Sequence, residues 1–257
     1  MGDAVVAALV AGVVSLLVTF GKLAWDARQA RQNERSAARD RLDRYRAPLL
    51  ASVHDLGGRL ENIRNTGFLV YLEVERRRDT ALKSTLFRLG QFFGWTEIIY
   101  GYSDRLRFES DEATRAVADT LAHIGWVLAS DEFDRTDEND FTTSQLMLWR
   151  EEQRAIGELM RQETNGEIRC LGFNSFMENY EDQFASWFES FALSLQLGSA
   201  PAAHRLAELQ RALAKLVRQI DVDQVLVQVG KDGQITEPGW AQSSTMESTR
   251  PAGDSST

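Results

Sequence analysis

The chain has 257 residues, four prolines, one cysteine and a formal net charge of −9. A single cysteine excludes an intrachain disulfide framework and suits a reducing compartment. The acidic balance argues against a general nucleic-acid surface, because such a surface needs clustered basic side chains to neutralise phosphates. We therefore expect no nucleic-acid partner.

Residues 1–25 have the composition of a transmembrane anchor. Eighteen residues, from Ala4 to Gly21, carry no formal charge and are rich in Val, Leu and Ala. A bilayer core of about 30 Å requires about 20 helical residues, and residues 23–25 can extend the run to that length. A cleaved signal peptide and a buried core helix are the alternatives, but no basic residue precedes the run and no A-x-A site follows it directly. The pattern predicts a retained single-pass anchor that contacts membrane lipid.

Small residues in this anchor recur every four positions, which is typical of membrane helices that pack closely against each other. They form two adjacent stripes: Ala4, Ala8 and Gly12, and beside them Ala7, Ala11 and Ser15. The stripes would allow a homodimer. The alternative is that Ala and Gly are simply common in membrane helices.

Residues 26–47 form a basic segment that we expect to be a helical stalk, either a weak coiled coil or a single solvated helix. Between Lys22 and Arg46 there are eight Lys or Arg and four Asp or Glu. Positive charge is retained on the cytoplasmic side, so the N-terminus is predicted outside and the C-terminal domain in the cytoplasm, at the inner (cell) membrane. The basic residues next to the anchor either bind anionic lipid or only set this topology, and the interspersed acids favour the second function. These residues are Lys22, Arg28, Arg31 and Arg35.

Residues 48–229 are predicted to form an all-α cytoplasmic domain, because apolar residues recur there with a period of about 3.6. We expect an up-and-down bundle of about five to six helices. The expected helices cover residues 48–76, with a weak point at Gly57 and Gly58, then 80–108, 110–130, 142–162, 175–197 and 199–220. Residues 131–140 are expected to be an acidic loop, and 166–172 a turn that carries Cys170. Residues 230–257, which lack periodicity and are rich in small and polar residues, are predicted to be a disordered tail.

Large aromatic side chains are concentrated in two of these helices, 80–108 and 175–197. The first also carries Gly90 and Gly94, which form a flat strip suited to a close neighbour. The aromatic clusters predict either the core of the bundle or an apolar ligand pocket between the two helices. The candidate pocket residues are Trp95, Glu97, Trp187 and Phe188.

No residue pattern in the chain predicts a reaction. The three histidines lie apart in the sequence, and none follows Glu at the spacing of a di-iron bundle. Phosphate-binding glycine motifs, the G-x-S-x-G elbow and Cys-x-x-Cys are missing. We therefore expect no catalytic residue, metal or cofactor, and we interpret Cys170 as structural. This favours a non-enzymatic protein without excluding an enzyme.

Two stretches have a familiar sequence, STLFRLGQFFGWTEII at Ser84–Ile99 and LMLWREEQRAIGELM at Leu146–Met160. They resemble a group of uncharacterised bacterial proteins that have one N-terminal transmembrane helix and a helical cytoplasmic domain. The resemblance covers residues 4–220 and implies the same architecture here. No activity is assigned to that group, so the resemblance implies no catalytic residue.

These observations predict a single-pass membrane-anchored helical protein that binds a protein partner, as a scaffold or sensor at the membrane. The alternative is a membrane-tethered enzyme or small-molecule receptor, with its pocket between the two aromatic-rich helices.

Overall fold

The computed structural model describes residues 22, 25, 26, 28–30, 33, 45–101, 111–133, 145–164, 167–197, 203–221, 227–230 and 233–236. The described part is mostly helical with two short hairpins, which confirms the all-α class. Apart from Lys22 and Trp25, the predicted anchor with its small-residue stripes lies outside the described residues, as do Arg31 and Arg35 of the stalk. Lys22 and Arg28 are helical and exposed. No helix within the described ranges is long and apolar enough to cross a bilayer.

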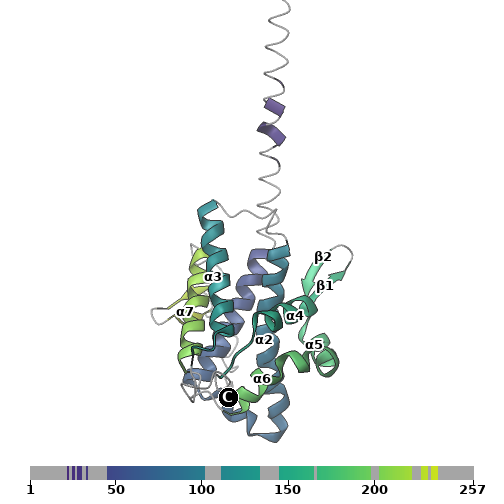
Figure 1. Cartoon of the computed structure of the whole chain (residues 1–257), viewed down its shortest axis with the longest axis vertical. Helices are drawn as coiled ribbons and strands as arrows, with labels where there is room; N and C mark the ends of the chain where they lie inside the picture. Colours follow the sequence, from purple (N-terminus) through teal and green to yellow (C-terminus); the bar gives the residue numbers. More distant parts are fainter. Residues whose placement is uncertain are drawn as a thin grey trace, which may run out of the picture.

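Long helices run roughly along the long axis of the molecule (Figure 1). They are the 45–65 helix, α2 (Glu75–Gly101), α3 (Asp111–Ala129) and α7 (Ala203–Ile220). The 45–65 helix and α2 are antiparallel, because the Tyr45 ring lies 6.4 Å from that of Trp95, while Arg59 donates to Ser84 Oγ at 3.3 Å. The apolar residues of α7 recur at helical spacing, and the helix face that they form is buried in the core. Its buried leucines are Leu206, Leu209, Leu213 and Leu216.

A second group of elements packs against α2, and its hairpin lies on the right in Figure 1. It begins with α4 (Arg150–Met160) and continues through the hairpin of β1 (Arg161–Thr164) and β2 (Glu167–Cys170), in which Arg161 pairs with Cys170. The chain then forms α5 (Phe173–Asn179), the π-helical turn η3 (Tyr180–Phe184) and α6 (Ala185–Gln196). The expected turn at 166–172 is therefore part of a hairpin, and the expected 175–197 helix contains a π-helical turn.

The first domain helix ends at residue 65 and not at 76. Gly67 adopts φ 70°, which glycine tolerates without strain, and the short 3-10 helix η1 (Phe68–Leu72) then leads into α2. The helix continues without a break through Gly57 and Gly58. Gly57 instead makes room for Ile235, whose Cδ1 would lie 2.8 Å from a Cβ at this position.

Ile235 belongs to a second hairpin, formed by β3 (Gln228–Val229) and β4 (Ile235–Thr236). The sequence placed residues 233–236 in the disordered tail, and for these residues that prediction is wrong. The correction has a tertiary cause, because Ile235 is buried against the 45–65 helix and the Gln234 amide donates to Glu61 at 2.8 Å.

α4 begins at Arg150, eight residues after the start at residue 142 that the sequence predicted. Residues 147–149, just before it, have no regular secondary structure, and the N–H of Leu148 donates to the carbonyl of Leu128 at 2.9 Å. The Glu152 carboxylate accepts a hydrogen bond from the N–H of Trp149 at 2.6 Å. This N–H, at the N-terminus of the helix, has no partner within the helix itself.

Arg205 joins the start of α7 to the end of α3. Its side chain is fully buried and donates to the carbonyl oxygens of Gln145 (2.8 Å), Ser130 (2.8 Å) and Val127. The last turn of a helix leaves its carbonyl groups without partners, and a cation is favourable at this end of the helix dipole. Arg205 therefore completes α3 from a distant part of the chain and makes α3 and α7 antiparallel.

Candidate functional site

A cavity of about 320 Å³ lies between α2, α3 and α4. This volume is at the lower end of the range of about 300–1,000 Å³ that is usual for small-molecule sites. α2 contributes Phe92, Phe93, Thr96, Glu97 and Tyr100, α3 contributes Leu121 and Gly125, and α4 contributes Arg150, Gln153 and Arg154.

The floor of the cavity is apolar, and its rim is charged. Phe92, Phe93 and Leu121 are buried, whereas Arg150 and Arg154 are exposed at the mouth. Thr96 adds no unpaired hydroxyl, because its Oγ1 donates to the carbonyl oxygen of Phe92 at 2.8 Å. The site thus combines an apolar interior with a solvent-exposed, charged entrance, which is the usual arrangement of ligand pockets.

Glycines set the distances between the walls of the cavity. A Cβ at Gly157 of α4 would lie 2.6 Å from Cγ of Glu97 and 2.9 Å from the carbonyl oxygen of Phe93, so α4 can approach α2 only with glycine here. On the opposite wall, a Cβ at Gly125 of α3 would overlap Nη1 of Arg150. The Gln153 amide donates to the carbonyls of Gly125 (2.9 Å) and Leu148 (2.8 Å) and thereby fixes α4 against α3.

Glu97 is the carboxylate of the cavity, and its side chain is 18% exposed. Arg154 Nε lies 3.7 Å from Glu97 Oε1. Burial raises the pKa of Glu97 above its ordinary value; the charge of Arg154 opposes this shift, Glu158 adds to it and Arg150 opposes it. Burial also raises the pKa of Tyr100, against the effect of Arg150. The rim therefore presents two guanidinium groups and one carboxyl whose pKa is raised by burial.

Of the four pocket residues that the sequence suggested, Glu97 lines this cavity and the other three lie elsewhere. Phe188 is fully buried, Trp95 packs against the core near Tyr45, and Trp187 is 39% exposed. The space between α2 and the α5–α6 segment is filled by aromatic rings and is therefore core. The ring centroids of Phe176 lie 4.7 Å from Phe184 and 5.4 Å from Phe87.

Sequence reasoning missed the α4 side of the cavity. Arg150, Gln153 and Arg154 have the spacing of residues on one helical face, and so do Phe93, Glu97 and Tyr100 on α2. The available signal was a partly apolar face that includes a carboxyl, opposite a face with two arginines. Nothing in the two local patterns says that the two helices are neighbours.

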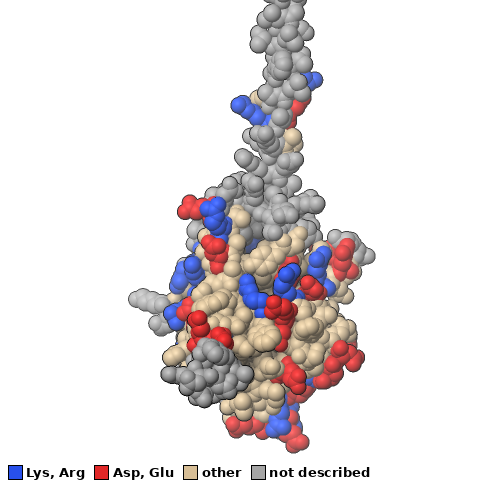
Figure 2. All heavy atoms as spheres, viewed as in Figure 1, with Lys and Arg blue, Asp and Glu red and all other residues tan. Residues whose placement is uncertain are grey.

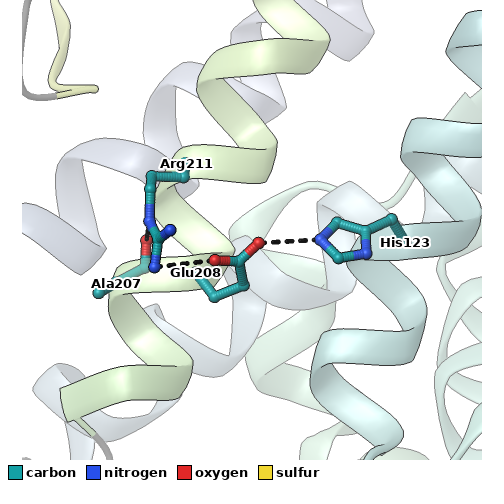
Figure 3. A network of polar contacts seen from close by, with 4 residues as sticks. All are labelled: His123, Ala207, Glu208 and Arg211. Carbon is teal, nitrogen blue, oxygen red and sulfur yellow. Dashed lines mark hydrogen bonds and ion pairs between the residues drawn. The ribbon is translucent and has the colours of Figure 1, made fainter.

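A polar network joins α3 to α7 on another side of the domain (Figure 3). Nε2 of His123 lies 3.0 Å from Glu208 Oε1, and Arg211 donates to the other carboxylate oxygen at 2.8 Å. The His123 ring also stacks on Trp126, with centroids 5.7 Å apart. Asp119, which shares a helical face with His123, is exposed. The network positions α7 and lies outside the cavity.

Arg59 of the 45–65 helix is a buried cation that lacks a carboxylate partner among the described residues. Its guanidinium lies 3.7 Å from the centroid of the Phe68 ring, and its Nε and Nη1 have no hydrogen-bond partner there. Burial, with a smaller effect of the nearby Arg88 charge, lowers the pKa of Arg59 to about 10. An adjoining void of about 10 Å³ is at the lower limit for one water molecule.

The remaining reactive groups offer no second chemical centre. Burial raises the pKa of the Cys170 thiol to about 12, so the thiol stays protonated and unreactive at neutral pH. Within the described ranges, no three His, Cys, Asp or Glu side chains are grouped to hold a metal ion. Figure 2 shows acidic and basic side chains interspersed over the face that it draws.

Comparison with known proteins adds no relative. A scan against protein-family models, a search of curated proteins and a search of solved structures each found no match.

Proposed function

We propose that this chain is a single-pass membrane-anchored protein whose cytoplasmic helical domain is a sensor, and that the α2–α3–α4 cavity binds its small-molecule ligand. The observation that carries the proposal is the cavity itself, with its buried apolar floor and charged rim. The uncharged run of residues 4–21 supports the anchor.

The chemistry of the cavity favours binding over catalysis. Glu97 is the only carboxylate among the lining residues, and no His, Ser or Cys lines the cavity in the part of the chain that is described. The Thr96 hydroxyl is engaged with the backbone. A nucleophile next to a base, which covalent catalysis requires, is therefore missing from this set.

The first test is native mass spectrometry of the full-length chain extracted from its own membrane. We expect an additional mass on the wild-type chain and none on the cavity-filling variant Thr96→Trp, whose side chain would occupy the space above Phe92. A helical far-UV circular dichroism spectrum of the variant controls for folding. Retention of the same mass in a folded Thr96→Trp would place the ligand elsewhere and contradict the proposal.

The proposed topology has a separate test. Protease added to intact cells without an outer barrier should leave the helical domain uncut, and the same protease should digest it after the cells are lysed. Cleavage of the domain in intact cells would reverse the topology.

A protein-binding scaffold is the second candidate function, and a different region favours it. A groove of about 770 Å³ lies between η1 and the end of α6, and exposed apolar residues border it, among them Val70 and Leu197, the latter 74% exposed. Exposed apolar surface of this kind is typical of protein contacts. We expect Leu197→Asp to remove a discrete cross-linked adduct in native membranes and Thr96→Trp to retain it. An adduct of twice the chain mass would identify a homodimer.

A further inference from the structure

The charge on the rim restricts the kind of ligand that the cavity can hold. Resting on the function proposed above, we propose that the ligand is an amphipathic anion: a single carboxylate or phosphate head held by Arg150, and an apolar body packed on Phe92, Phe93 and Leu121. Two guanidinium groups and one carboxyl line the mouth, so an incoming anion meets a net positive rim.

Arg150 is the better of the two arginines for the head group. Gly125 leaves the space in which the Arg150 guanidinium lies against α3, because any larger residue there would overlap Nη1. A guanidinium offers parallel N–H groups that match the two oxygens of a carboxylate or phosphate. Arg154, in contrast, lies next to Glu97, with its Nε 3.7 Å from Oε1 of the carboxyl.

Glu97 does not make the cavity a cation site. Its carboxyl lies 3.7 Å from Nε of Arg154, so a cation of the protein already faces its charge. The groups that face it are Arg150, Arg154 and Glu158 from α4 and Tyr100 from its own helix, whereas the lining residues of α3 carry no charge. Protonation of Glu97 removes the one carboxylate charge among the described lining residues, so anion binding should strengthen as the pH falls towards the pKa of Glu97.

The volume of the cavity limits the size of the ligand's apolar body. A volume of about 320 Å³ accommodates one ring or one short chain and not the paired chains of a membrane phospholipid. The anion is therefore expected to be a soluble molecule that enters from the aqueous side, with its head at the exposed arginines.

The test is isothermal titration calorimetry of the full-length chain in detergent micelles, with blank titrations into micelles alone. The probes share one body and differ in the head: 3-phenylpropanoate, 3-phenylpropylamine and 3-phenylpropanol. We expect the anion to bind more tightly than the amine and the alcohol. Phenyl phosphate replaces the acid in a further titration, and binding of either anion supports the proposal. A single-chain lysophospholipid distinguishes a lipid source, and its tighter binding would overturn the expectation of a soluble ligand.

Substitutions then assign the head group. Arg150→Gln should weaken anion binding about tenfold or more, because a charge-assisted bidentate contact is lost. Arg150→Lys keeps the charge and should recover part of this loss. Arg211→Gln is the matched control, since Arg211 is 68% exposed, pairs with a carboxylate and lies outside the cavity. Unchanged anion affinity in a folded Arg150→Gln would overturn the assignment.

The direction in which Glu97→Gln changes the affinity distinguishes an anionic ligand from a cationic one. For an anion it should tighten binding about two- to fivefold at neutral pH and flatten the pH dependence, because a repulsive charge is removed. For a cation the same variant should weaken binding, so a weaker affinity for every probe would overturn the anion proposal. Tighter binding of the amine or the alcohol that is lost in Thr96→Trp would contradict the ligand class and leave the cavity as the site. Absence of binding by all anions at millimolar concentration would also reject the class, while the native mass experiment tests the site independently.

Discussion

The α2–α4 contact and the α3–α7 contact hold the same domain together in opposite ways. α4 lies close to α2 because glycines at the contact leave room for side chains of the other helix. Met160 packs on Gly90 and Gly94, and Glu97 packs on Gly157. α7 reaches α3 through long polar side chains, Arg205 at one end and the His123–Glu208 pair further along. Close backbone approach fixes one wall of the cavity, whereas hydrogen bonds fix the position of the last helix. Each contact can therefore be broken by a different kind of substitution.

Arg205→Met should have the largest effect. The change removes hydrogen bonds to the carbonyls of Gln145, Val127 and Ser130 in the buried interior. Leaving such groups without partners should lower the free energy of unfolding by about 3–5 kcal/mol. Urea unfolding followed by circular dichroism measures the loss, and a loss below that of the glycine variant described next would contradict the structural role of Arg205.

Gly157→Ala should have the second effect, in the α2–α4 contact. Its Cβ would meet the Phe93 carbonyl oxygen, which belongs to the backbone and cannot rotate away. We expect a loss of about 1–3 kcal/mol, as for other overpacked sites. Gly58→Ala is the matched control, because nothing lies within 4 Å of its Cβ. In a helix this control should be stabilising by about 0.5–1 kcal/mol, and equal losses in both variants would remove the argument for close approach.

Glu208→Gln should weaken the α3–α7 contact only slightly. The substitution keeps the shape of the side chain and removes the charge between His123 and Arg211. Because these groups are partly exposed, the expected loss is about 0.5 kcal/mol. High salt should reduce the difference between wild type and variant, and a salt-independent loss would point to packing and not to charge.

Glu97→Gln should have the smallest effect on stability, and its sign depends on pH. Burial raises the pKa of Glu97 in the folded chain above its ordinary value of 4.5, so the folded state binds this proton more tightly than the unfolded state. The wild type should therefore lose stability as the pH rises from about 4.5 through the folded pKa. The variant lacks this loss, and the stability difference between the two chains should grow over that interval and then level off. A difference that does not change with pH would contradict the raised pKa.

The helices could be predicted from the sequence, whereas their partners could not. Apolar periodicity predicted 110–130 and 199–220, close to Asp111–Ala129 and Ala203–Ile220. The predicted start at residue 142 was wrong, because no local pattern contains the hydrogen bond from Leu148 to the distant Leu128 that precedes the helix. The aromatic clusters were interpreted correctly in one of their two alternatives, the core, since large rings fill space wherever two helices meet.

The candidate site shows the same division. Glu97 could be predicted as a pocket residue, because a carboxyl on an aromatic helix face needs polar groups or solvent beside it. Arg150 and Arg154 could not be selected, because only the pairing of α4 with α2 through Gly157 brings them to Glu97.

The burial of Arg205 also sets an order of events during synthesis. The carbonyl group of Ser130 accepts its hydrogen bond from Arg205, which is synthesised 75 residues later. At about 5–20 residues per second, a ribosome needs about 4–15 s to add that length of chain. Throughout this interval the growing chain carries an incomplete α3, so the domain reaches its final state only after translation has passed residue 205.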